Sequence, residues 1–253
     1  MNAQLKQVSK SIHNVGDYAL FMLKAFSTLK EALSHRPIIF KQMVRIGVKS
    51  IPVVLLASCF AGVVTTLQAA YQLEQTFLSE QVVGAVVVPT LMLEMAALLP
   101  GLVLASRVGA SIAAELGTMK VTEQIDALEA MGLNSIAFLV LPRVIAGVFM
   151  FPSLYVASAL VSILAGGWSA DFLGLLSIES FIQGARAYFL PFDAFYGASK
   201  SLAFGFLITS ISCWKGFNAR GGAQGVGSAT TQAVVVSCVS ILIADYILAE
   251  ILL

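Results

Sequence analysis

The sequence predicts an all-α integral membrane protein, in which an N-terminal interfacial helix precedes five transmembrane helices. Hydrophobic residues make up 58% of the 253 positions and charged residues only 11%, whereas about 25% of the residues in a soluble domain are charged. The apolar residues also form long runs, and a helix needs roughly 20 of them to cross a bilayer. So many apolar residues cannot be buried in one soluble core.

Residues 1–46 are expected to form a separate cytoplasmic or interfacial helical segment, ahead of a five-span domain of residues 47–253. Apolar side chains recur there at helical spacing, and Lys24 lies elsewhere on the helical wheel. This pattern predicts a helix in the membrane interface; a cytoplasmic helix packed on a partner protein is the alternative. The apolar positions are Tyr18, Phe21, Met22, Ala25, Phe26 and Leu29.

Five apolar runs are predicted to cross the membrane. They cover residues 47–70, 82–106, 144–172, 198–214 and 230–253. Lys and Arg gather in the cytoplasmic loops of membrane proteins. A cytoplasmic N-terminus places all 15 basic residues on that side except Arg186 and Lys200. We therefore expect the N-terminus in the cytoplasm and the C-terminus on the far side of the membrane.

A second interfacial helix is predicted on the far side, within residues 171–198. Its apolar stripe consists of Ile178, Phe181, Ile182, Ala185, Tyr188 and Phe189. No metal site is expected anywhere, because the three Cys and two His residues lack ligand spacing. The formal net charge of +1 gives no reason to expect a nucleic-acid partner.

The cytoplasmic segment 107–143 predicts a short amphipathic helix. Val121, Ile125 and Leu128 fall on one face with Met131 at its edge, and Gly132 is a natural stop. The opposite face is acidic and is either solvated or in contact with protein, since acidic groups are disfavoured beside anionic lipid headgroups. The acidic residues are Glu115, Glu123, Asp126 and Glu129.

Long motifs occupy this segment and the start of the last span. They read Glu115-Leu116-Gly117-Thr118-Met119-Lys120-Val121-Thr122-Glu123-Gln124-Ile125-Asp126-Ala127-Leu128, then Met131-Gly132 and Pro142-Arg143, and later Gly221-Gly222-Ala223 followed by Gly225-Val226-Gly227-Ser228-Ala229-Thr230-Thr231. In these residues, and over most of 40–253, the chain resembles the MlaE/YrbE permeases. These are the membrane subunits of MCE-type ABC transporters that move phospholipids between membranes.

The resemblance implies an MlaE-type ABC permease fold and a function in phospholipid transport between the inner and outer membranes, which maintains lipid asymmetry. A coupling helix over residues 115–131 would dock into a separate MlaF-like ABC ATPase. The coupling residues implied are Glu115, Lys120, Glu123, Gln124, Asp126, Leu128, Met131 and Arg143. The chain is not expected to be an enzyme or to bind a cofactor, because it has no phosphate-binding G-x-x-x-x-G-K-[ST] loop; ATP and Mg would be used by the partner.

The other partners implied are an MlaD-like MCE-domain protein, phospholipids and a second copy of the chain. A homodimer is expected because one five-helix bundle encloses little volume for a two-tailed lipid. Neither a signal peptide nor a transit peptide is visible in the first 35 residues. The expected location is therefore a bacterial inner membrane, with the C-terminus in the periplasm.

Glu94 and Asp245 fall within predicted spans, where ionisable groups face the bundle interior or a wet cavity. Glu94 matches the acidic position near the lipid pocket of the family, although Leu93 replaces the usual Arg beside it. The predicted lipid-binding residues are Glu94, Leu67, Gln68, Tyr71 and Leu98. A packing role for Glu94 and an aromatic-belt role for Tyr71 are the alternatives.

Asp245 is expected to be structural, bonded to Ser or Thr of a neighbouring helix. Two further family departures are Ala96-Ala97 in place of Gly-Pro and Ser135 in place of a Pro. A different function remains open from the residues alone, namely a stand-alone secondary transporter with Glu94 or Asp245 as a proton relay. No internal repeat supports it. A membrane enzyme is a third class, but the acidic residues of 115–129 lack the spacing of a catalytic site.

Overall fold

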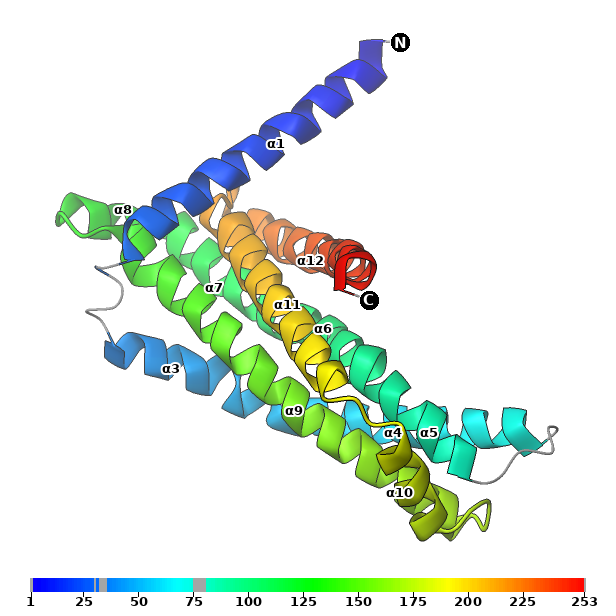
Figure 1. The fold of residues 1–253 in the computed structure, drawn as a ribbon. Helices are drawn as coiled ribbons and strands as arrows, with labels where there is room; N and C mark the ends of the chain where they lie inside the picture. Colours follow the sequence, from blue (N-terminus) through cyan, green and yellow to red (C-terminus); the bar gives the residue numbers. More distant parts are fainter. Residues whose placement is uncertain (1, 30, 32–35, 75–80, 253) are drawn as a thin grey trace.

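The computed structural model describes residues 2–29, 31, 36–74 and 81–252, and the side chains from Val15 onward, apart from Glu74. All regular elements among these residues are helices (Figure 1). In chain order they are α1 (Asn2–Ser27), α3 (Arg36–Ile46), η1 (Val48–Ser50), α4 (Ile51–Glu74), α5 (Gln81–Thr90), η2 (Leu91–Met95), α6 (Ala96–Leu104), η3 (Ala105–Gly109), α7 (Ala110–Val121), α8 (Gln124–Ala130), η4 (Ile136–Val140), α9 (Leu141–Phe172), α10 (Ile178–Ala187), α11 (Pro191–Phe217) and α12 (Gly222–Leu252).

Four stretches of helix in the described part of the chain are long and apolar enough to cross a membrane. They are Arg36–Leu73, Gln81–Val121, Ile136–Phe172 and Gly222–Leu252, and they contain four of the five predicted spans. The first two exceed the predictions, because α3 leads through η1 into α4, and span two continues through η3 into α7. Residue 253, the predicted end of the last span, lies outside the described residues.

The remaining predicted span, 198–214, lies within α11. This helix has 27 residues and packs against α9, α12 and α7 in the bundle. It is less apolar than the other four because it contains Lys200, Lys215 and several Ser residues. Its buried side chains include Phe204 and Ile208, which have no exposed surface. The all-α membrane fold is therefore confirmed, whereas a membrane crossing by α11 stays a prediction because α11 is not among the four stretches above.

The seam between α4 and α9 is lined by small side chains at every fourth residue. Ser58, Gly62 and Thr66 of α4 are buried against α9, and the Oγ atoms of Ser58 and Ser158 lie 2.7 Å apart. A Cβ atom added to Gly62 would lie 1.9 Å from the backbone oxygen of Ser162. Small residues let helix backbones approach closely in a membrane, where van der Waals contact drives association. The seam thus fixes span one against span three.

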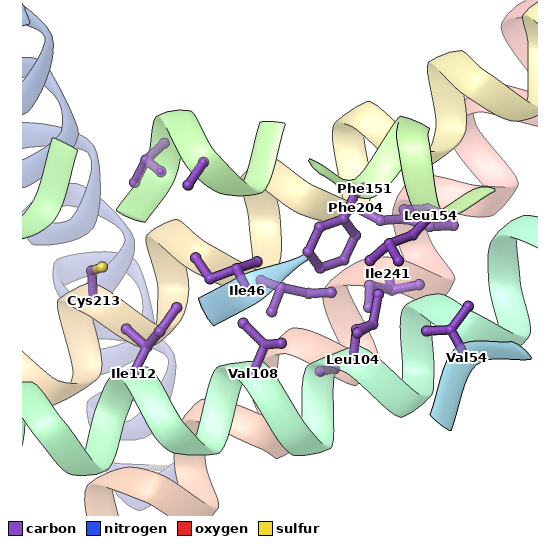
Figure 2. Packing of buried hydrophobic residues seen from close by; sticks show 14 of the residues in the cluster. Ile46, Val54, Leu104, Val108, Ile112, Phe151, Leu154, Phe204, Cys213 and Ile241 are labelled. Atoms are coloured by element: carbon purple, nitrogen blue, oxygen red, sulfur yellow. The ribbon is translucent and has the colours of Figure 1, made fainter. Parts of the chain in front are cut away.

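A second cluster of side chains fills the centre of the bundle. Leu104, Val108 and Ile112 lie along one face of span two and point toward α11 and α12, where Phe204 and Ile241 meet them (Figure 2). Ile46 adds a contact from α3. This core connects the elements that carry the charged residues described below.

α1 crosses one end of the bundle, where it packs against α11 and η4, and its location in the membrane interface stays a prediction (Figure 1). Met22 and Ala25 are buried, whereas Leu20, Leu23 and Phe26 have 50–64% of their surface exposed. Tyr18 ties the helix to α11, because its hydroxyl lies 2.7 Å from Ser210 Oγ. α10, predicted as the far-side interfacial helix, packs on α5 through Phe181, which is 2% exposed.

We predict that Gly62→Ala lowers the melting temperature of the purified protein in detergent. The added Cβ must push the α9 backbone away, and overpacking costs about 1–3 kcal/mol. Gly227→Ala is the matched control, because Gly227 lies in α12 with no atom within 4 Å of an added Cβ. Equal melting temperatures for the two variants would show that the α4–α9 seam is not close-packed.

Candidate functional site

A buried lysine links three spans in the interior of the bundle. Lys200 of α11 has no exposed surface, and its Nζ lies 2.6 Å from Glu94 Oε1 and 2.7 Å from Asp245 Oδ1. Both contacts are ion pairs, and the contact with Glu94 is also a hydrogen bond. The ring of Tyr196 lies under Nζ, with its centre 4.7 Å away. A charged group within a span requires such partners.

The backbone around Glu94 has an unusual conformation. Pro89 lies inside α5, and the chain then forms the π-helix η2, which contains Glu94. Single π-turns of this kind are frequent at functional sites. Side chains bond two carbonyl groups of η2: the Tyr155 hydroxyl donates to Met92 O at 3.0 Å, and Lys200 Nζ approaches Leu93 O at 3.4 Å. α9 and α11 therefore both hold Glu94 in place.

The two carboxylates of this cluster remain partly open. The side chain of Glu94 is 35% exposed and that of Asp245 is 18% exposed. Since Lys200 is fully covered, the exposed surface of the three charged groups belongs to the two carboxylate side chains.

Two expectations for these residues are corrected. Asp245 does not bond to a Ser or Thr residue but pairs with Lys200, which lies within reach across α11 and α12. Lys200 was assigned to the far side of the membrane or its edge, but its burial beside Glu94 places it inside the bundle. The cation that the family pattern carries beside Glu94 is missing at Leu93, and in this chain Lys200 supplies one. A lone Lys within a 17-residue apolar run was the sequence signal for it.

The other predicted lipid-binding residues lie apart from this cluster. Gln68 and Tyr71 are exposed near the C-terminal end of α4, and Tyr71 has 67% of its surface exposed. Neither side chain makes a hydrogen bond or an ion pair with a described residue. Leu67 is half-buried, and Leu98, one turn after Glu94, packs against the central core. The lipid-binding role of all five residues stays a prediction.

The predicted coupling helix over 115–131 is wrong as a single helix. α7 ends at Val121 and α8 begins at Gln124, because Glu123 adopts a left-handed conformation with φ of 59°. This conformation costs a non-glycine residue roughly 1–2 kcal/mol. Lys120 Nζ bridges the turn to Asp126 Oδ1 at 2.6 Å. The turn brings Ile125, which has no exposed surface, back onto the core.

Side chains on α8 divide into an anchored and an exposed set. Leu128 packs against the core with Ile125, and Ser135 Oγ donates to Glu129 Oε1 at 2.6 Å. Gly132 follows with a φ of 76°, as expected for a helix stop. Met131 is 67% exposed, so it lies on the outer surface and not at the edge of the buried face. We call the exposed set the α8 surface; it consists of Glu123, Gln124, Asp126 and Met131.

Glu115 and Arg143 form a different part of this region. Glu115 Oε2 lies 2.6 Å from Nη1 of Arg45 on α3 and 3.2 Å from Nη2 of Arg143 on α9. Arg143 is 4% exposed and also donates to the carbonyl of Leu139. These two predicted coupling residues therefore join α7 to α3 and α9 at the base of the α8 surface. Arg45, which the sequence analysis left out, completes the group.

The described residues contain no group of three or more side chains that could hold a metal ion.

We predict that Lys200→Met strongly destabilises the protein, because it leaves two carboxylates without their cation; breaking a buried pair costs about 3–5 kcal/mol. The melting temperature in detergent measures the loss. Lys41→Met, on an exposed position of α3, is the control. Adding Glu94→Gln and Asp245→Asn to Lys200→Met should recover most of the stability. A triple variant as unstable as Lys200→Met would contradict the ion-pair explanation.

Comparison with known proteins identifies the family. The sequence pattern of the family described as Permease MlaE matches residues 39–251. A "Probable ABC transporter permease protein" of Rickettsia bellii is 37% identical over 245 residues, which cover 97% of this chain and 94% of that protein. A protein of the same description from Rickettsia felis is 37% identical over 98% of this chain and 96% of its own length.

A plant relative is also similar. "Protein TRIGALACTOSYLDIACYLGLYCEROL 1, chloroplastic" of Arabidopsis thaliana is 37% identical over 210 residues, which cover 83% of this chain and 60% of that protein. The resemblance inferred from the motifs is thus confirmed. The chain belongs to the MlaE permease family and is an ABC transporter permease.

Proposed function

We propose that this permease moves phospholipids between the inner and outer membranes of a bacterium, driven by a separate ATPase subunit. The observation that carries the proposal is the charged cluster of Glu94, Lys200 and Asp245, whose acidic side is open among the spans. A polar lipid headgroup that moves from the membrane surface into the bundle needs polar groups to contact there. The name of the Arabidopsis relative contains that of a galactolipid, which supports a lipid substrate.

The ATPase is proposed to bind the α8 surface. This surface exposes two carboxylates together with Met131, and Leu133 beside it is 46% exposed. Acidic groups around an exposed apolar side chain favour a protein partner over lipid headgroups. Its base is held by Arg45, Glu115 and Arg143, so that a force applied to α8 reaches α3 and α9. ATP and Mg would be bound by the partner.

A second copy of the chain is proposed to complete the site. Within the chain α12 buries only a stripe of Ala229, Ala233, Ser237 and Ile241, four residues apart. The rest of the helix exposes large apolar side chains, among them Leu242 and Tyr246. This face adjoins Asp245, so a partner helix here would enclose the open side of the charged cluster. An MCE-domain protein would bind on the far side, near α10.

We predict that charge reversal of the α8 surface abolishes ATPase coupling. Glu123→Lys with Asp126→Lys should prevent the ATPase from co-purifying and should remove the lipid-stimulated ATP hydrolysis of the reconstituted complex. Lys120→Met breaks the same internal ion pair without adding charge and should retain most coupling. Glu179→Lys, on exposed α10, is the control for a charge change elsewhere. Normal coupling in the double variant would refute the docking role.

We predict that Glu94→Ala lowers the amount of phospholipid recovered with the purified permease severalfold. Lys200 still has Asp245 as a counter-charge in this variant, so the helices should assemble normally. Bound lipid is measured by mass spectrometry after extraction. Glu250→Ala removes an exposed carboxylate from the same helix as Asp245 and serves as the control. Unchanged lipid in Glu94→Ala would exclude the proposed role of this residue.

A further inference from the structure

A cavity of about 800 Å³ lies beside α1 at the end of the bundle where α11 ends and α12 begins. α1 forms one wall, and the end of α11 with the start of α12 forms the other (Figure 1). Ring contacts hold the two walls together: Tyr18 meets Trp214 with centres 5.8 Å apart, and Phe21 meets Phe217 at 5.5 Å. The volume is in the range of ligand pockets, which is about 300–1,000 Å³.

Basic side chains outnumber acidic ones in this cavity. Lys24, Lys215 and Arg220 line it, together with Asp17 and Glu129. Among the residues that the structure describes, Lys24 and Arg220 form no ion pair. Lys215 Nζ donates to Gln232 Oε1 at 3.1 Å and lies 4.7 Å from the centre of the Trp214 ring, so its charge also lacks an acidic partner. Three cations and two carboxylates therefore line the same space, which leaves it with a net positive charge.

The neighbouring groups suit a phosphate. Ser228 adds a hydroxyl group from α12, within the first two turns of the helix that begins at Gly222. Glu129 Oε1 accepts a hydrogen bond from the Ser135 hydroxyl. Cationic side chains with hydroxyl and backbone donors are the usual ligands of a phosphate oxygen.

The position of the cavity relative to the membrane interface indicates the source of that phosphate. α1 exposes the apolar side chains of Leu20, Leu23 and Phe26 together with the basic Lys24, which is the pattern of a helix in the membrane interface. A cavity roofed by this helix opens at the level of the headgroups. Leu20, Phe21 and Trp214 also line the cavity. Trp residues are enriched at the membrane–water interface. An apolar wall beside the cations fits the glycerol and upper acyl chains of a lipid.

We infer that this cavity binds the headgroup of an anionic phospholipid from the cytoplasmic leaflet. Lys24, Lys215 and Arg220 contact the phosphate, and the lipid fastens α1 to the adjoining ends of α11 and α12. A zwitterionic lipid binds less well, because its own cation meets the cationic side chains. The inference does not rest on the proposed transport function, since the cavity shares no residue with the Glu94 cluster.

Trp214 provides a direct probe. Trp168 is 75% exposed on α9, at the other end of the molecule, so Trp168→Phe leaves Trp214 as the sole fluorescent tryptophan. The full chain in detergent micelles is titrated with phosphatidylglycerol, with phosphatidylcholine and with inorganic phosphate. We expect a saturable change in fluorescence with phosphatidylglycerol, and a much weaker response to phosphatidylcholine.

Charge-removal variants identify the ligands. Lys24→Gln with Lys215→Gln and Arg220→Gln should weaken phosphatidylglycerol binding by about tenfold or more, because one charge-assisted hydrogen bond alone is worth about that factor. The matched control, Arg36→Gln with Lys41→Gln and Lys49→Gln, removes the same charge from exposed positions on α3 and η1 and should leave the affinity unchanged. Arg220→Gln alone, on an exposed residue, serves if the triple variant does not fold.

Three results would overturn the inference. Equal responses to phosphatidylglycerol and phosphatidylcholine would show that the cavity does not select anionic lipid. Saturation by inorganic phosphate that phosphatidylglycerol cannot displace would assign the cavity to a soluble anion. An equal loss of affinity in both triple variants would show that the lipid responds only to the total charge of the cytoplasmic face.

Discussion

The ion pairs of Lys200 constrain the whole arrangement of the spans. An ammonium group without any exposed surface needs its counter-charges in place, and these come from η2 and α12. Three helices that are distant in sequence must therefore be positioned together. This requirement matters most for α12, whose other buried contacts in the chain are a narrow stripe of mainly small residues. The same requirement keeps the open carboxylate side of the cluster at a fixed place in the bundle.

Span two connects this cluster to the α8 surface. The helix from Gln81 to Val121 carries Glu94 in its first half and Glu115 near its end, about 30 Å away at about 1.5 Å per residue. Glu115 holds Arg45 and Arg143, so the end of the helix moves with α3 and α9. A displacement of α8 would therefore be transmitted through the turn at Glu123 and along span two to the charged cluster. The π-helices η2 and η3 lie on this path, where the regular hydrogen-bond pattern changes and the helix can bend.

Hydropathy and basic residues predicted most of the fold, because a bilayer imposes its constraint on each span separately. The pairing of side chains between different spans leaves no such pattern in the local sequence. The apolar run that contains Lys200 revealed a charged residue but gave no information on its partners. For the same reason, Asp245 was expected to bond to a Ser or Thr hydroxyl group. The break at Glu123 was missed because no Gly or Pro marks it: the buried position of Ile125 imposes the left-handed residue. The stripe of Ser58, Gly62 and Thr66 is visible in the sequence as small residues at every fourth position, but it was not predicted as a helix contact.

Both sites act on the same pair of helices, α11 and α12. In the charged cluster, Lys200 of α11 pairs with Asp245 of α12. At the other end of the same two helices, beside the cavity, Lys215 of α11 bonds to Gln232 of α12. A headgroup in that cavity would add α1 to the unit. α12 packs on α11 and α7 mainly through a stripe of small side chains, and a headgroup would add contacts beyond this stripe. Binding at the cytoplasmic end would thus reduce the tilt available to α12 and, through Asp245, restrict how far the acidic side of the cluster can open.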